Sequence, residues 1–241
     1  MRKLFRFLPN FVVSYLTNIY DLRVRRHCVS SYSQEGEDMI LRRIFERSKS
    51  GFYVDVGAHH PFRFSNTFYF YKLGWRGINI DAMPGSSESF NKLRPRDINI
   101  ETGVGNGDSF LTYYVFNEPA LNGFSEELSS ERDGDKGFFV VDKIKVRVRE
   151  LRKILDEYLP KGTSIDFMSI DVEGFDLDVL RSNDWEKYSP KAILVEVIFD
   201  DLAELYQNEI VVFLVQHGYK VYAKAINTVI FIQHDDSFRF S

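Results

Sequence analysis

Short apolar runs alternate along the chain with segments whose apolar residues recur at helical spacing. The apolar runs are rich in β-branched and aromatic residues and end near glycine or acidic residues, which is typical of strands. They cover residues 51–57, 77–83, 98–104, 110–116, 143–148, 166–171, 192–198, 219–225 and 228–233. The last two runs are close enough in sequence to predict an antiparallel hairpin.

Helices are predicted in the intervals between these runs. Ser33 is a candidate N-cap for the first helix, and Gly218 is a candidate stop for the last. The predicted helices cover residues 33–47, 66–73, 86–93, 150–158, 175–181 and 202–217. Strands that alternate with helices predict an α/β fold in which helices cover a mostly parallel sheet.

Two parts of the chain do not fit this alternation. Residues 1–30 predict a helical extension ahead of a single domain, 31–241; the apolar run 11–19 is too short to cross a bilayer. We expect this extension to pack on the domain, and the alternatives are a peripheral membrane or partner contact through residues 1–20 and a cleaved signal. Residues 117–142 are polar and predict a long loop, either a lid or a solvated loop without a role.

Charge and cysteine content exclude some classes of protein. The net charge of −4 provides no global basic field, so we expect no nucleic-acid partner. The one cysteine, Cys28, cannot form an intrachain disulfide or a cysteine-based metal site. A reducing, cytoplasmic location is therefore expected.

The candidate chemistry lies where the predicted strands end, because ligands of open parallel sheets bind beyond the carboxyl ends of the strands. The first strand ends with Asp55 and Gly57, a buried carboxylate followed by a residue that allows a tight turn. His59 and His60 follow instead of a G-x-G-x-x-G motif, which argues against a dinucleotide pyrophosphate. The alternative is that Asp55 caps a local turn.

The next two strand ends fit a nucleoside. Asp81 comes about 20 positions after Gly57, where an acidic residue can accept hydrogen bonds from a ribose diol. The glycine-rich turn that begins at Gly103 and Val104 would lie beside an adenine ring, or would be a plain hairpin turn. For Asp81 the alternative is a surface acid at a strand end.

A pair of carboxylates, Asp171 and Glu173, ends the strand 166–171. If both residues stay extended, their side chains lie on the same side, where they could do acid–base work or hold a substrate hydroxyl. Glu196 ends the next strand with a less defined role. His59 could supply a base, but no histidine has a recognisable metal-ligand spacing, so we expect no metal site.

The order of these motifs resembles the FkbM family of methyltransferases that use S-adenosylmethionine (SAM). The resemblance covers residues 32–197, most of the chain. Its motifs are YSQEGED at 32–38, VDVGAHHP at 54–61, SNT at 65–67, GWRGINIDAMP at 74–84, LNGFSEEL at 121–128 and SIDVEGFDLDVL at 169–180. Many family members carry Glu at the position of Asp81, whose shorter side chain should still reach the ribose.

The resemblance implies a Rossmann-like class I methyltransferase fold, with seven strands of which the last pair is antiparallel. It also implies SAM as methyl donor and O-methylation of a sugar, glycolipid or natural-product hydroxyl. The cofactor-binding residues expected from it are Gln34, Asp38, Asp55, Gly57, Ala58, Asp81, Ala82, Gly103, Val104 and Asp171. Asp55 and Gly57 would line the methionine end of SAM, and Gln34 and Asp38 would reach the pocket from the preceding helix.

Asp171 and Glu173 would face the acceptor, a small molecule or glycan that carries a hydroxyl. We expect Glu173 or Asp171 to be the general base, with His59 as the second candidate, and residues 117–142 to close over the acceptor. Two other classes stay open: a nicotinamide-dependent oxidoreductase on a similar sheet, and a non-catalytic binding protein that has kept the fold.

Overall fold

The structure is a computed structural model that describes residues 9, 12, 15, 28–198 and 201–234. The chain divides into two compact units, residues 1–31 and residues 32–241. The predicted extension over residues 1–30 falls mostly outside the described residues, so that prediction stays open. Within the described residues, no helix combines the length and apolarity needed to cross a membrane.

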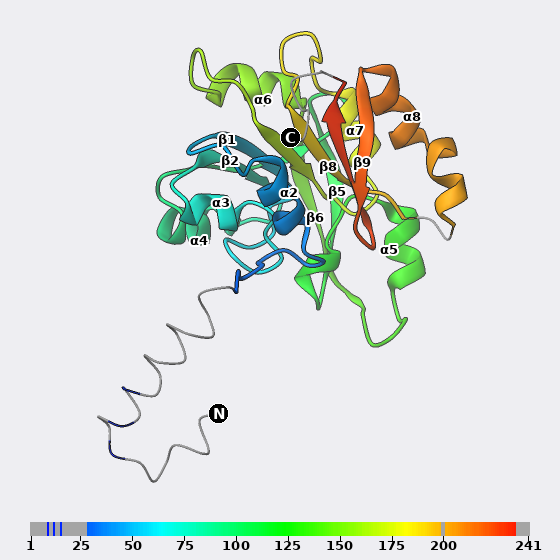
Figure 1. Ribbon diagram of the computed structural model, residues 1–241. Coiled ribbons are helices and arrows are strands. Elements are labelled where there is room, and N and C mark those ends of the chain that lie inside the picture. The colour runs from blue at the N-terminus through cyan, green and yellow to red at the C-terminus, as the bar shows by residue number, and fades with distance from the viewer. Residues whose placement is uncertain (1–8, 10–11, 13–14, 16–27, 199–200, 235–241) are drawn as a thin grey trace. The chain divides into compact units, whose positions relative to one another are not determined.

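The second unit contains, in its described part, a seven-stranded sheet of order β3-β2-β1-β7-β8-β10-β9. Figure 1 shows the strands as arrows with helices packed beside them. Neighbouring strands from β3 to β8 are parallel, and β10 is antiparallel to both β8 and β9. The strands are β1 (Phe52–Val56), β2 (Arg76–Asp81), β3 (Ile98–Glu101), β7 (Phe167–Ile170), β8 (Ala192–Glu196), β9 (Tyr219–Lys224) and β10 (Thr228–Gln233). The predicted seven-stranded, mostly parallel Rossmann-like sheet and its antiparallel hairpin are therefore confirmed.

Successive side chains of the central strands point to opposite faces of this sheet, so that a hydrophobic core forms on each face. On β1, Tyr53 points into a cluster with Leu41 and Phe70, while Val54 and Val56 point into a larger cluster on the other face. The first cluster is covered by α2 (Glu37–Ile44) and α3 (Phe68–Lys72). The second is covered by α6 (Leu151–Tyr158), α7 (Asp176–Arg181) and α8 (Glu209–Gln216). Helix α4 (Ser86–Leu93) packs along β2 and β3.

Local hydrogen bonding changes two predicted elements. The helix predicted over 202–217 is broken at Asn208, where the backbone is extended. The Asn208 side chain caps α8 by accepting a hydrogen bond from the Ile210 N–H. A 3-10 helix, η3 (Leu202–Gln207), precedes it. The strand predicted over 98–104 is interrupted at Thr102, so that β3 joins the large sheet and β4 (Gly103–Val104) joins another.

That other sheet has three strands among the described residues, in the order β4-β6-β5. Strands β5 (Ser109–Phe116) and β6 (Val140–Arg149) are antiparallel, and β4 is parallel to β6. The loop predicted over 117–142 is wrong in part, because it contains a 3-10 helix, η2 (Pro119–Leu121), and a helix, α5 (Glu126–Arg132). Ser125 begins α5 by accepting a hydrogen bond from the Leu128 N–H.

Candidate active site

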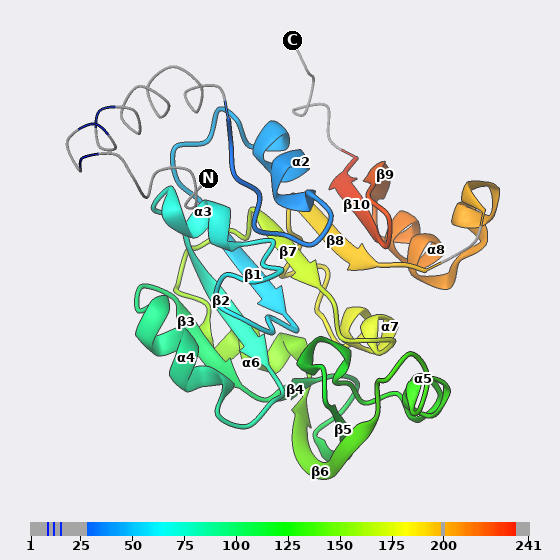
Figure 2. The same ribbon diagram turned by 90° about the horizontal axis from the view of Figure 1, so that it is seen from below.

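A pocket of about 400 Å³ lies beyond the carboxyl ends of β1, β2 and β7, as expected for an open parallel sheet. The arrowheads of β1 and β2 point toward the three-stranded sheet (Figure 2). Residues of β5 and of the segment after it, including Tyr113, Pro119 and Asn122, line the opposite wall. The pocket therefore lies between the strand ends of the large sheet and the three-stranded sheet.

The structure brings nearly all the predicted site residues to this pocket. Its lining includes Gln34, Asp55, Gly57, Ala58, His59, Asp81, Ala82, Gly103, Val104, Asp171 and Glu173. Asp38 does not line it. The Asp38 side chain is fully buried and accepts hydrogen bonds from the Tyr32 N–H at 2.7 Å and the Ser33 hydroxyl at 2.9 Å. Asp38 thus holds the segment that carries Gln34 instead of reaching the pocket itself.

The turn after β1 is held by backbone and carboxylate contacts. Gly57 has a positive φ of 80°, and its N–H donates to the Ile80 carbonyl on β2 at 2.9 Å. Asp81 accepts from the His59 N–H at 2.7 Å and from the Met83 N–H at 2.8 Å. Burial raises the pKa of Asp81, and these two N–H groups lower it. Asp81 therefore both lines the pocket and shapes the turn that faces it.

Asp55 is 5% exposed and lies at the end of β1. Its Oδ2 accepts a hydrogen bond from the Thr67 hydroxyl at 2.7 Å. Burial raises the pKa of Asp55, while the positive charge of Arg94 and the Thr67 hydroxyl lower it. The Ser169 hydroxyl also lowers this pKa, so the protein partners the carboxylate through two hydroxyls at the border of the pocket.

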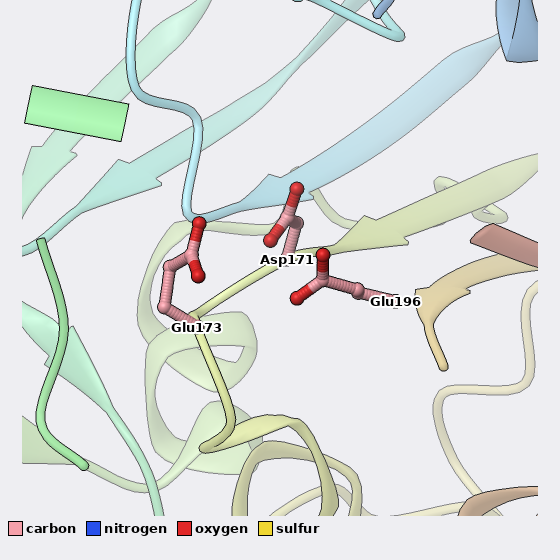
Figure 3. A group of neighbouring side chains, drawn as sticks. All are labelled: Asp171, Glu173 and Glu196. Atoms are coloured by element: carbon pink, nitrogen blue, oxygen red, sulfur yellow. The ribbon is translucent and has the colours of Figure 1, made fainter. Parts of the chain in front are cut away.

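Three carboxylates, Asp171, Glu173 and Glu196, point toward one another where β7 and β8 end (Figure 3). One carboxylate oxygen from each lies within 4.8 Å of the others. Desolvation and mutual repulsion raise the pKa of Asp171 well above its ordinary value and that of Glu196 to about 8. In the described part of the chain, this is the group of side chains whose spacing could hold a metal ion. The sequence analysis did not predict such a group.

Glu173 has a cationic partner. The Arg132 guanidinium, in the last turn of α5, donates to Glu173 Oε2 at 2.5 Å. Burial raises the pKa of Glu173, and Arg132 lowers it. The ion pair joins the segment between β5 and β6 to the turn after β7.

The geometry of this turn differs from the extended backbone that the sequence predicted. Strand β7 ends at Ile170, and Glu173 has a left-handed backbone with φ of 55°. The Asp176 carboxylate causes the bend by accepting from the Val172 and Gly174 N–H groups. Asp171 and Glu173 reach the same pocket through this turn and not through strand alternation. A non-glycine residue at positive φ is a strained conformation that is often found at functional sites.

His59 lies at the rim of the pocket, also with a left-handed backbone, φ 52°. Its ring stacks on Phe64 with centroids 6.3 Å apart. Burial and the charge of the neighbouring Arg63 lower the pKa of His59, which favours the neutral imidazole. Across the rim, Arg63 donates to Glu118 at 3.1 Å and connects the loop after β1 to η2.

Some pocket residues were missed from the sequence. Tyr113 and Asn122 come from the second sheet and the segment after it, and Asn66 follows the loop after β1. Among the described residues, buried atoms without a hydrogen-bond partner include Asn66 Oδ1, Ser86 Oγ and His59 Nε2, all from pocket-lining residues. The SNT and LNGF motifs contain two of these positions, but a motif alone does not tell which side chain faces a ligand.

The sequence profile of the methyltransferase FkbM domain matches residues 55–221. No curated protein matches the chain. Among solved structures, the chain is similar to the precorrin-6y C5,15-methyltransferase of Geobacter metallireducens, with TM-score 0.43, 15% identity, and 81% of this chain and 85% of that chain covered. It is also similar to a putative O-methyltransferase from Klebsiella pneumoniae, with TM-score 0.41, 12% identity, and 96% and 94% covered.

Proposed function

The chain belongs to the methyltransferase FkbM family, and from this premise we propose that it methylates a hydroxyl oxygen of a sugar, glycolipid or natural product. As a member of that family it is a SAM-dependent methyltransferase. The acceptor, the roles of the site residues and a cytoplasmic location are the parts that we propose. The family match gives no support to the oxidoreductase alternative.

The pocket fits SAM in size and in polarity. A volume of about 400 Å³ lies within the range of small-ligand pockets. The unpartnered polar atoms of Asn66, Ser86 and His59 offer hydrogen bonds to a polar ligand. Asp55 and Gly57 would hold the methionine end of SAM, Asp81 the ribose, and Gly103 and Val104 the adenine. When bound, SAM supplies an electrophilic methyl group.

The observation that carries O-methylation is the carboxylate group at the acceptor end of the pocket. A hydroxyl is a weak nucleophile, and a positioned base that takes its proton accelerates the transfer. Glu173, Asp171 and Glu196 converge there, and the first two line the pocket. A raised pKa brings a carboxylate closer to the working pH, where it is a more effective base.

Among these groups, Glu173 is our first choice for the base. Its ion pair with Arg132 fixes the carboxylate in one orientation, so that one oxygen is held by Arg132 and the other can accept the proton. Asp171 lies beside it and would share that proton. His59 is the second candidate, since its imidazole is neutral, but its backbone is tied to Asp81 on the ribose side of the pocket.

The wall opposite the sheet would exclude water and orient the acceptor. Pro119, Ala120 and Phe124 present apolar surface to the pocket, and the Arg63–Glu118 ion pair joins this wall to the loop after β1. Alignment of the acceptor oxygen with the methyl group supplies much of the rate in such a transfer. Residues 117–142 therefore act as the acceptor wall in this proposal.

A SAM-consumption assay against a panel of glycans, glycolipids and small hydroxylated natural products from the native cell tests the proposal. We expect turnover with a hydroxyl acceptor, a product that is one methyl group heavier at oxygen, and much slower turnover in Glu173→Gln. Turnover that is confined to amine acceptors would overturn O-methylation. Thermal shifts with SAM and with NAD, measured separately, check the cofactor, and only SAM should stabilise the protein.

A further inference from the structure

A buried hydrogen-bond chain runs from Arg94, through Thr67, to Asp55 at the pocket. We propose that Arg94 and Thr67 are positioning residues that hold the Asp55 carboxylate as an acceptor for the ammonium group at the methionine end of SAM. The proposal rests on the proposed SAM site and names a function for residues outside the pocket lining.

Arg94 follows the last residue of α4, and its side chain is fully buried and surrounded by partners. It donates to Asp97 Oδ2 at 2.9 Å, to the Tyr53 hydroxyl at 2.8 Å and to Thr67 Oγ1 at 2.9 Å. Longer contacts of 3.4 Å reach the Pro61 carbonyl and the Ser65 hydroxyl. A buried guanidinium with this many acceptors has one orientation, because each of its N–H groups is directed.

The direction of the Thr67 proton follows from this arrangement. A hydroxyl has one hydrogen to donate, and Arg94 can only donate, so Thr67 Oγ1 must accept from Arg94. The Thr67 hydrogen is then free for Asp55 Oδ2, 2.7 Å away, which is shorter than the 3.2 Å to the Ser65 hydroxyl. Oδ2 of Asp55 is thereby fixed as a hydrogen-bond acceptor.

The charges around Asp55 leave room for a cation. Arg94 is balanced by Asp97, which also accepts from the Gly77 N–H and from Asn79 Nδ2. Asp97 also acts on Asp55, and Asp55 in turn acts on Asp81 and Asp171, so that its remaining charged neighbours are acidic. A carboxylate that is 5% exposed with acidic neighbours is completed electrostatically by a positive group in the pocket. The ammonium group of SAM has that charge.

A pair of variants at Thr67 tests this hydrogen-bond chain, which we call the Arg94–Thr67–Asp55 relay, without removing the buried Arg94. Thr67→Val keeps the shape and removes the hydroxyl, whereas Thr67→Ser keeps the hydroxyl. Calorimetric titration uses two ligands, S-adenosylhomocysteine, which carries the ammonium group, and 5′-methylthioadenosine, which lacks the amino-acid part. Thr228→Val is the matched control, since Thr228 is also buried but donates to Glu37 instead.

We expect Thr67→Val to weaken S-adenosylhomocysteine binding about tenfold and methylthioadenosine binding less than about twofold. Thr67→Ser and Thr228→Val should bind both ligands as the wild type does. The hydroxyl lowers the pKa of Asp55, so in Thr67→Val that pKa rises. Because binding is lost as the pH falls through this pKa, the loss should begin at a higher pH in the variant.

Equal weakening of both ligands, or equal loss in the serine variant, would show that Thr67 acts only through packing and would overturn the relay. A wild-type protein that binds methylthioadenosine but gains nothing from the amino-acid part would also overturn it, while the nucleoside site would stand. If the wild type binds neither ligand, the proposed cofactor site is itself wrong, and the relay falls with it.

Discussion

A Cβ atom placed on Gly57 would lie 1.7 Å from the carbonyl oxygen of Asp171. The turn after β1 therefore approaches the end of β7 so closely that no side chain fits between them. The approach puts the two strand ends that carry Asp55 and Asp171 on one wall of the pocket. Glycine is required here by the chain's own backbone, in addition to any approach by a ligand.

Gly57→Ala should therefore cost about 3 kcal/mol or more of unfolding free energy and abolish S-adenosylhomocysteine binding. The positive φ alone accounts for about 1–2 kcal/mol. Gly74→Ala is the control, because Gly74 also has a positive φ but no atom lies within 4 Å of the place where its Cβ would be. Urea unfolding and calorimetry measure both effects, and equal losses in the two variants would contradict the collision with Asp171.

Asp81→Ala should weaken S-adenosylhomocysteine binding by at least about tenfold. The variant loses the acceptor for the ribose and also frees the His59 and Met83 N–H groups that Asp81 holds. Asp108→Asn, at an exposed acid outside the pocket lining, is the control. Titration calorimetry checks the prediction, and an unchanged affinity would remove Asp81 from the site.

Glu173→Gln should lower kcat by about 100-fold or more while SAM affinity stays near the wild-type value. A companion variant, Arg132→Met, removes the cation that lowers the pKa of Glu173, so that pKa should rise. Activity is lost as the pH falls through the pKa of the base, so the acid limb of the rate profile should move to higher pH. Arg43→Met, in an exposed ion pair, is the control. Full activity in Glu173→Gln would reassign the base.

The stability of the protein should fall as the pH rises. Burial raises the pKa of Asp176 to about 8 and that of Glu196 to about 8. A carboxyl group whose pKa is raised by folding stabilises the folded state below its ordinary pKa, and this contribution is lost as the pH rises toward about 8. We expect a decrease of roughly 1–3 kcal/mol in unfolding free energy between about pH 5 and about pH 8. Asp176→Asn should reduce this slope in urea titrations.

The sequence predicted the sheet and most of the pocket because both depend on local pattern. Buried strands such as β1 and β2 are marked by apolar runs, and the residue that ends a parallel strand lies at the pocket edge whatever its partners are. That rule alone placed Asp55, Asp81 and Asp171 together. It failed for the backbone of Glu173, since the bend there depends on hydrogen bonds to Asp176, which a strand pattern does not contain.

Contacts between distant segments could not be predicted in the same way. The pairing of Arg132 with Glu173 needs the position of α5, and the sequence of that segment is polar and gave no periodic signal. The family resemblance assigned Asp38 to the pocket together with Gln34, whereas the Asp38 side chain turns back to hold Tyr32 and Ser33. Arg94, at the end of a predicted helix, had no signal that it would be buried.

Strands β5 and β6 and the helix α5 between them form one continuous block of sequence, from Ser109 to Arg149. That block supplies the proposed acceptor wall, whereas Asp55, Asp81, Gly103 and Val104, which we propose bind SAM, lie ahead of it in the sequence. Recombination of this block between related genes would thus exchange the molecule that receives the methyl group and leave donor recognition intact. Related enzymes that share the same SAM-binding residues could then differ in the molecules that they methylate.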